Sequence, residues 1–311
     1  MTKQFTTFAA NTPPDHQLYV KANRTKSRSA LVQQTVAAYS ADLPQAEPLM
    51  SGSANLNVMM KTARKAGRTL LKDFTEVEQL QVSTKGPGDF VTRADRQAEE
   101  TIREDLMEAR PTYGFLGEEG SSIEGEDPTR RWIVDPLDGT TNFLHGLPHW
   151  AVSIALEHKG TIVAAVVYDP TKDEMFYAEK GQGAWMNETR IRVSGRHRMI
   201  DCIFSTGLPW AGRADLPETL QDLARVLPAT SGVRRFGAAS LDLAYVAAGR
   251  YDGFWERRLK IWDIAAGVLI VKEAGGLLEP IDPAGNELKD GALICANEAI
   301  FSTFAKVIRN T

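Results

Sequence analysis

Two carboxylates three positions apart, Asp135 and Asp138, follow a short apolar run and precede Gly139 and two threonines. The apolar run predicts the end of a buried strand, and the Asp-Pro and Asp-Gly pairs favour turns. We therefore expect both side chains to leave the strand into a tight turn and point into one small volume. Two anions held that close repel each other unless a proton or a cation lies between them. Carboxylate and carbonyl oxygens suit a hard ion such as Mg²⁺. The simpler alternative is a polar turn in which Asp138 caps the following helix.

Further acidic residues also stand at the predicted end of a strand or start of a helix: Asp95, the pair Glu118 and Glu119, and Asp263. Each has a simpler explanation, respectively as an exposed helix residue, a surface loop or a helix N-cap. A site with several carboxylates, no catalytic Cys and no required His has the residues that metal-assisted transfer of a phosphoryl group to water needs. Two ions about 3.5–4 Å apart would activate the water and stabilise the leaving alkoxide, and Asp135 and Glu118 could bridge them.

Other catalytic classes lack their motifs in this chain. It contains no GxxxxGK[ST], no GxGxxG after a strand and no GxSxG elbow, which argues against P-loop enzymes, dinucleotide binding and serine hydrolases. Residues 139–141 enter a predicted helix and could offer N–H groups to a phosphate. His145 and His149 lie outside any HExxH frame, so we expect them to be rim or packing residues. We expect Gly181-Gln182-Gly183 to form a turn.

The composition is that of a soluble globular protein, with 311 residues, 43% hydrophobic and 24% charged. A formal net charge of −4 provides no global basic field for nucleic acid. The two cysteines form no CxxC pair, which suits a reducing compartment, and we expect a cytoplasmic location. No apolar run approaches the roughly 18 residues of a membrane span, so no membrane partner is expected.

The first 50 residues differ from the rest of the chain. They carry five Lys and Arg residues against three Asp and Glu residues, and they show no extended helix or strand pattern. We expect residues 1–50 to be a disordered extension or a misassigned start, with Met50 as the natural first residue. Residues 51–311 are predicted to form a single catalytic domain.

The elements that must hold the acidic residues can be predicted from hydrophobic spacing. Apolar residues recur at helical spacing from 56 to 74, and a strand end followed by a second amphipathic helix spans 89–109. Further helices are predicted over 216–227, 240–248, 264–274 and 298–308, and strands over 113–116, 151–156, 161–168, 175–178, 200–205, 253–255, 277–279 and 292–295. Helices and strands do not alternate as βαβ units, which favours layers of helix and antiparallel-rich sheet.

Three motifs in this order make the chain resemble the inositol monophosphatase family, and its bacterial branch in particular. They are GEE at residues 117–119, WIVDPLDGTTNF at 132–143, and WDIAAG at 262–267 followed by EAGG at 273–276. The resemblance implies a mixed α/β (α+β) fold, a layered α-β-α-β-α sandwich, commonly as a homodimer. It also implies a lithium-sensitive, Mg²⁺-dependent phosphatase that binds two or three ions per site.

The resemblance further implies individual roles. Metal ligands are implied at four carboxylates and one backbone carbonyl: Glu118, Asp135, Asp138, Asp263 and Leu137. Thr140 and Glu118 would orient the attacking water, and Asp95 would support Thr140 and a third, weakly held ion. Substrate contacts are implied at Leu137, Asp138, Gly139, Thr140, Ala239, Glu256 and Asp263. Residues 85–88 would form a mobile loop over the site.

The resemblance makes hydrolysis of myo-inositol 1-phosphate, by attack of metal-activated water, the leading hypothesis. Family members that cleave histidinol phosphate, 3′-phosphoadenosine 5′-phosphate or fructose 1,6-bisphosphate supply alternative small phosphorylated substrates. A hypothesis of another class is a transcription-antitermination partner of RNA polymerase and Nus factors with incidental phosphatase activity. A basic docking edge could be formed by Arg190, Arg192, Arg196 and Arg198, although such a run is more often a solvated surface.

Overall fold

The computed structural model of the chain describes residues 52–75, 82–86, 89–209 and 216–311. All of these residues belong to one compact unit, Met50–Thr311. The predicted N-terminal extension lies outside the described residues. None of the described helices is both long and apolar enough to cross a membrane.

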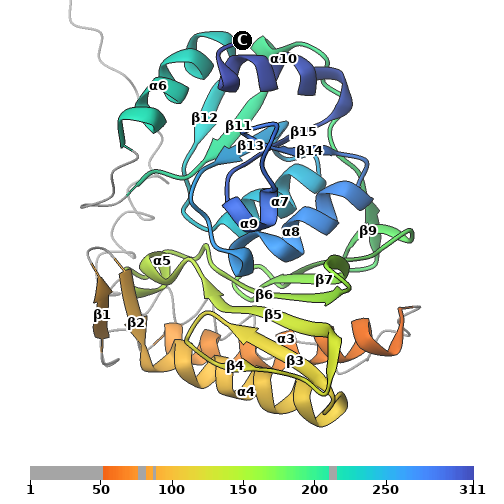
Figure 1. The fold of residues 1–311 in the computed structure, drawn as a ribbon. Helices are drawn as coiled ribbons and strands as arrows, with labels where there is room; N and C mark the ends of the chain where they lie inside the picture. The colour runs from red at the N-terminus through yellow and green to blue at the C-terminus, as the bar shows by residue number, and fades with distance from the viewer. Residues whose placement is uncertain (1–51, 76–81, 87–88, 210–215) are drawn as a thin grey trace, which may run out of the picture. The chain divides into compact units, whose positions relative to one another are not determined.

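The described helices and strands follow the chain in a mixed order (Figure 1). The helices are α3 (Ala54–Phe74), α4 (Arg93–Ala109), α5 (Thr140–Leu144), η2 (Met199–Asp201), α6 (Leu216–Val226), η3 (Leu227–Ala229), α7 (Ala239–Ala247), α8 (Ile261–Glu273), α9 (Glu287–Asp290) and α10 (Glu298–Arg309). The strands are β1 (Val82–Gly86), β2 (Asp89–Thr92), β3 (Tyr113–Gly117), β4 (Ser122–Ile123), β5 (Asp127–Asp138), β6 (Ala151–His158), β7 (Thr161–Asp169), β8 (Glu174–Glu179), β9 (Gly183–Met186), β10 (Thr189–Ile191), β11 (Ile203–Thr206), β12 (Gly232–Arg234), β13 (Gly253–Glu256), β14 (Leu277–Pro280) and β15 (Leu293–Ala296).

The first two layers are a pair of helices and the larger sheet that they cover (Figure 1). This sheet has eight strands in the order β10-β9-β8-β7-β6-β5-β3-β4, and only β3 and β5 run parallel in it. Helix α3 begins after Ser53, whose side chain accepts the N–H of Leu56. The apolar faces of α3 and α4 then bury against the sheet, as the helical spacing predicts.

The third layer consists of α7 and α8, which lie between the two sheets (Figure 1). Helix α7 is buried along its whole length and α8 from residue 264 to residue 271, because both are covered from two sides. The fourth layer is a five-stranded sheet in the order β12-β11-β13-β15-β14. Helices α6 and α10 cover its outer face, where Phe204, Trp255 and Phe304 pack together. The predicted α-β-α-β-α sandwich is confirmed.

Several predicted boundaries move in the structure. The strand predicted over 200–205 begins at Ile203, because residues 199–201 form the short helix η2. Helix α8 begins three residues earlier than predicted, at Ile261. Of the predicted loop 85–88, positions 85 and 86 belong to β1, which pairs antiparallel with β2, and positions 87 and 88 lie outside the described residues.

Candidate functional site

Asp135 and Asp138 both lie at the carboxyl end of β5, where the register with β6 shifts. Asp135 pairs with Ser153 and Asp138 with Ala151, so β5 has one residue more than β6 over this stretch. In a regular strand, residues three apart point to opposite faces. The extra residue is a β-bulge, which reverses the alternation and lets both carboxylates face one side. The predicted convergence is therefore correct, but the predicted turn is wrong, because both residues still belong to the strand.

Thr140, the first residue of α5, connects the end of β5 to the start of α4. Its hydroxyl lies 3.0 Å from the carbonyl oxygen of Leu137 and 3.4 Å from Oδ2 of Asp95. A hydroxyl has one proton, so Thr140 donates to one of these oxygens at a time. The N–H of Leu137 donates to Oδ1 of Asp135 at 3.0 Å. One hydrogen-bonded group thus contains four of the predicted site residues.

Asp138 caps a helix, but a different helix from the one predicted. Helix α5 begins after Gly139 without a side-chain cap. Oδ2 of Asp138 instead accepts the N–H of Ser240 at 2.7 Å and its hydroxyl at 2.5 Å, in the first turn of α7. This contact brings Ala239, the first residue of α7 and a predicted substrate contact, next to the end of β5.

Asp263 lies in the first turn of α8 rather than before the helix. Its Oδ2 accepts the N–H of Lys260, the N-cap residue, at 2.7 Å. The carbonyl of the preceding residue, Trp262, accepts a hydrogen bond from Ser153, which pairs with Asp135 across β6 and β5. The predicted helix-end position is thus correct, but Asp263 is the third helical residue and not the N-cap.

Glu118 follows the last residue of β3, beside the end of β5. Its N–H donates to the carbonyl of Val134 at 3.1 Å, which continues the parallel pairing of β3 with β5 by one bond. The neighbouring Glu119 forms an ion pair with Arg96 of α4, with Nε and Oε2 3.6 Å apart. Because Val134 directly precedes Asp135, this bond holds the backbone of Glu118 close to the first predicted ligand.

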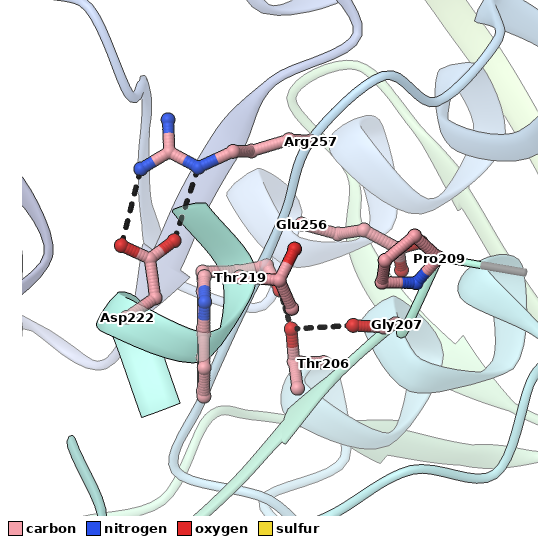
Figure 2. Close-up of a pocket in the computed structure, with 8 residues that line it drawn as sticks. Thr206, Gly207, Pro209, Thr219, Asp222, Glu256 and Arg257 are labelled. Atoms are coloured by element: carbon pink, nitrogen blue, oxygen red, sulfur yellow. Dashed lines mark hydrogen bonds and ion pairs between the residues drawn. The ribbon is translucent and has the colours of Figure 1, made fainter. Parts of the chain in front are cut away.

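Glu256 ends β13, lines a small pocket, and its charge acts on both Asp263 and Asp242 (Figure 2). Its carboxylate occupies the space over Gly207, where an added Cβ would lie only 1.9 Å from Oε1. The next residue, Arg257, donates two hydrogen bonds to the buried carboxylate of Asp222, at 3.0 and 3.2 Å (Figure 2). The pocket is lined by Thr206, Gly207, Pro209, Thr219, Asp222, Trp255, Glu256 and Arg257.

The carboxylates of the site raise one another's pKa values. Burial raises the pKa of Asp135 well above its ordinary value, and four neighbours raise it further: Glu118, Asp138, Asp263 and Asp95. The pKa of Asp263 is also raised, mainly by burial and secondly by the charge of Asp138. Burial raises the pKa of Asp138 to about 6, although the hydrogen bonds from Ser240 and Ala239 lower it. Such effects decline with distance, so the structure brings these side chains together.

The donor set of this carboxylate cluster fits a hard divalent cation. Several buried carboxylates cannot all be ionised without a compensating charge. Their oxygens, with the carbonyl of Leu137, are the ligands that Mg²⁺ prefers. Within residues 52–75, 82–86, 89–209 and 216–311, no three His, Cys, Asp or Glu side chains form a ready coordination shell. The support for a metal site is therefore the burial, charge and chemistry of the donors.

The two histidines near the motif lie outside the carboxylate cluster. His145 is exposed. His149 packs against Phe236 and Tyr245, with ring centroids 5.0 and 5.9 Å apart, and burial lowers its pKa to about 4. The predicted packing role of His149 is therefore confirmed. Elsewhere, the turn predicted at residues 181–183 leads into β9, which begins at Gly183.

Ser240, Asp242 and Glu99 are features of the site that sequence reasoning missed. Asp242 of α7 is 1% exposed, and burial raises its pKa, with the charges of Glu256 and Asp138 as further causes. Neither Ser240 nor Asp242 stands in a motif that indicates this contact. Glu99 could have been predicted from the sequence, because it stands four residues after Asp95 and therefore lies on the same face of α4.

Comparison with known proteins gives consistent matches. A family model described as "Inositol monophosphatase family" matches residues 53–311. The inositol-1-monophosphatase of Rhizobium meliloti (strain 1021) is 55% identical over 260 residues, which are 84% of this chain and 98% of that protein. The Nus factor SuhB of Pseudomonas aeruginosa PAO1 is 44% identical over 82% of this chain and 95% of its own length. The crystal structure of the extragenic suppressor protein suhB from Bartonella henselae superposes with a TM-score of 0.80 at 52% identity, over 83% of this chain and 99% of that one.

Proposed function

The chain belongs to the inositol monophosphatase family and is therefore a phosphatase, and we propose that it hydrolyses myo-inositol 1-phosphate to myo-inositol and phosphate. The observation that carries this proposal is the buried carboxylate cluster around Asp135, with Glu256 and its pocket beside it. A carboxylate accepts hydrogen bonds from hydroxyl groups, so Glu256 suits a polyol leaving group. The chain is 55% identical to the inositol-1-monophosphatase of Rhizobium meliloti over 98% of that protein, and this similarity supports the same substrate.

We propose that the site works with two or three Mg²⁺ ions. Their ligands would be Glu118, Asp135, the carbonyl oxygen of Leu137, Asp138 and Asp263. When bound, Mg²⁺ lowers the pKa of a water molecule and neutralises the charge of the phosphate oxygens.

The protein's own groups then position the reactants. Thr140, placed between Leu137 and Asp95, holds the attacking water by its hydroxyl, and Glu118 orients the same water. Asp95 keeps Thr140 in place and supports the third ion. Glu256 binds the polyol part of the substrate. The phosphate and the polyol hydroxyl groups are contacted by Leu137, Asp138, Gly139, Thr140, Ala239 and Asp263.

A substrate panel tests this assignment. We expect kcat/KM with Mg²⁺ to be highest for myo-inositol 1-phosphate, and lower for histidinol phosphate, 3′-phosphoadenosine 5′-phosphate and fructose 1,6-bisphosphate. Omission of Mg²⁺ should abolish turnover of every substrate. Equal and very slow turnover of all four would contradict the inositol assignment, and undiminished turnover in EDTA would contradict the metal assignment.

Three further properties belong to this proposal. We propose a cytoplasmic homodimer, which light scattering coupled to size exclusion would detect as twice the chain mass. We propose inhibition by lithium, because Li⁺ is a small hard cation that can replace Mg²⁺ at an oxygen site. Activity unchanged by Li⁺ on the order of tens of millimolar would exclude lithium sensitivity.

A second candidate function is that of a partner of RNA polymerase and Nus factors. It is favoured by the similarity to a Nus factor and by exposed arginines at positions 190, 192, 196 and 198. Arg196 and Arg198 each pair with an aspartate, Asp252 and Asp201, which reduces the basic character of this edge. A pull-down with RNA polymerase and Nus factors tests it. Asp135→Asn should retain this binding while it abolishes hydrolysis, and failure of the wild type to bind would exclude the role.

A further inference from the structure

Glu99 is a buried carboxylate that points from α4 toward the turn that carries Glu118. Its side chain belongs to a residue only 2% exposed. Oε2 accepts the N–H of Glu119 at 2.7 Å, and Oε1 accepts the N–H of Ser121 at 3.1 Å. Each carboxylate oxygen thus binds one backbone amide of the segment 117–121, on both sides of Gly120.

Gly117 leaves the room that this carboxylate fills. A Cβ at position 117 would lie 2.3 Å from Oε2 and 2.5 Å from Cδ of Glu99, closer than real side chains approach. The N–H of Gly117 donates to the carbonyl of Ser121 at 2.8 Å, which closes the turn. The glycine of the GEE motif is therefore a contact position for Glu99.

The turn is consequently held from two directions. On one side, the N–H of Glu118 donates to Val134 of β5 at 3.1 Å. On the other side, Glu99 of α4 binds the amides of Glu119 and Ser121. The backbone of Glu118 is bonded directly at the first anchor and is next to the second, so a shift relative to Asp135 would strain or break these hydrogen bonds.

A carboxylate is the side chain that this arrangement requires. Two N–H donors need two acceptors, and hydrogen bonds to a charged acceptor are stronger than neutral ones. Glutamine would place an NH₂ group against one of the amides and leave a buried donor without its partner.

We propose that Glu99 is a positioning residue that holds the Glu118 turn in the place where Glu118 binds Mg²⁺. Glu99 itself contacts neither metal nor substrate in this account. The inference rests on the proposed function, in which Glu118 is a metal ligand.

The test compares Glu99→Gln with a matched control, Glu273→Gln. Glu273 of α8 also accepts hydrogen bonds from two backbone N–H groups, at 2.7 and 2.8 Å, but these belong to Gly181 in the turn after β8 and to Gly183 at the start of β9. Mg²⁺ binding to the metal-free proteins is measured by titration calorimetry, and kcat is measured as a function of Mg²⁺ concentration. We expect Glu99→Gln to bind Mg²⁺ about ten-fold more weakly, as for loss of a charged hydrogen bond. Glu273→Gln should bind Mg²⁺ within about two-fold of the wild type.

The concentration dependence separates positioning from general damage. Because every proposed ligand remains in Glu99→Gln, high Mg²⁺ should restore kcat to nearly the wild-type value. Gly117→Ala, which displaces the Glu99 carboxylate without changing it, should weaken Mg²⁺ binding in the same way, and it serves as the test if Glu99→Gln does not fold. Unchanged Mg²⁺ affinity in the folded variant would overturn the inference.

A third variant identifies which proposal has failed. If Glu118→Gln binds Mg²⁺ as the wild type does, the ligand assignment of the proposed function is wrong. If Glu118→Gln loses affinity while Glu99→Gln does not, the ligand assignment holds and the positioning role of Glu99 is overturned.

Discussion

Oδ2 of Asp138 accepts both the N–H and the hydroxyl of Ser240, which is 102 positions later in the chain. These bonds connect the end of β5 to the first turn of α7, and so connect the larger sheet to the central helix layer. The N–H groups at a helix start carry partial positive charge, which stabilises the Asp138 carboxylate against the effect of burial. The candidate site therefore lies where a strand end and a helix start meet.

Asp138 should make the stability of the metal-free protein depend on pH. Its pKa is raised to about 6, whereas an unfolded aspartate loses its proton near pH 4. The folded state holds more protons over this interval, so the contribution of Asp138 to the free energy of unfolding falls as the pH rises from about 4 through 6. Asp138→Asn should stabilise the metal-free protein by about 3 kcal/mol more at pH 8 than at pH 4.

Urea denaturation in EDTA at both pH values checks this prediction. His149, whose pKa burial lowers to about 4, has the opposite effect between about pH 4 and 6.5. Its effect cancels when the variant is compared with the wild type at the same pH. A difference between variant and wild type that does not change with pH would show that the pKa of Asp138 is the same in the folded and unfolded protein.

Asp135→Asn should reduce kcat by more than about 10³-fold, because it removes the central charge of the proposed metal site. Steady-state rates at saturating Mg²⁺ measure the effect. Asp105→Asn is a suitable control, since Asp105 pairs with Lys65 at the surface at 2.6 Å and should keep wild-type activity. Near-wild-type turnover of Asp135→Asn would refute the ligand assignment.

We expect kcat to depend on the hydroxyl group of Thr140 more than on the volume of its side chain. Thr140→Val keeps the volume but removes the donor that lies 3.0 Å from the carbonyl of Leu137, and should lower kcat about 10²-fold with little change in KM. Thr140→Ser keeps the hydroxyl and should remain within a few-fold of the wild type. Equal kcat values for the two variants would mean that the hydroxyl does not hold the water.

Asp222 should stabilise both the fold and the pocket beside Glu256. Asp222→Ala leaves Arg257 and Arg225 without the buried carboxylate that they share, and should cost about 2–3 kcal/mol of unfolding free energy. We also expect a higher KM for the inositol phosphate, because Arg257 directly follows Glu256. Asp201→Ala removes an exposed pair with Arg198 and should change stability by less than about 1 kcal/mol. Similar losses in both variants would show that burial of the pair is unimportant.

Local sequence pattern was sufficient for most elements of the fold. The apolar spacing from Leu56 to Phe74 predicts α3, because a surface helix buries one stripe against a sheet. Helices α7 and α8 are apolar on all sides, so spacing alone could not show that they lie between two sheets. The short strands β1, β4, β9, β10 and β12 were missed, since two to five residues carry little measurable alternation.

The sequence by itself determined which chemistry this protein could perform, because carboxylates, a threonine and glycines in fixed motifs specify oxygen ligands and their turns. It did not determine how Asp135 and Asp138 come to share a face, which depends on one extra residue in β5 relative to β6. Nor did it indicate that Ser240 binds Asp138, or that Glu99 binds the amides beside Glu118. These contacts join segments up to 102 residues apart, and only the packing of the layers brings them within hydrogen-bond distance.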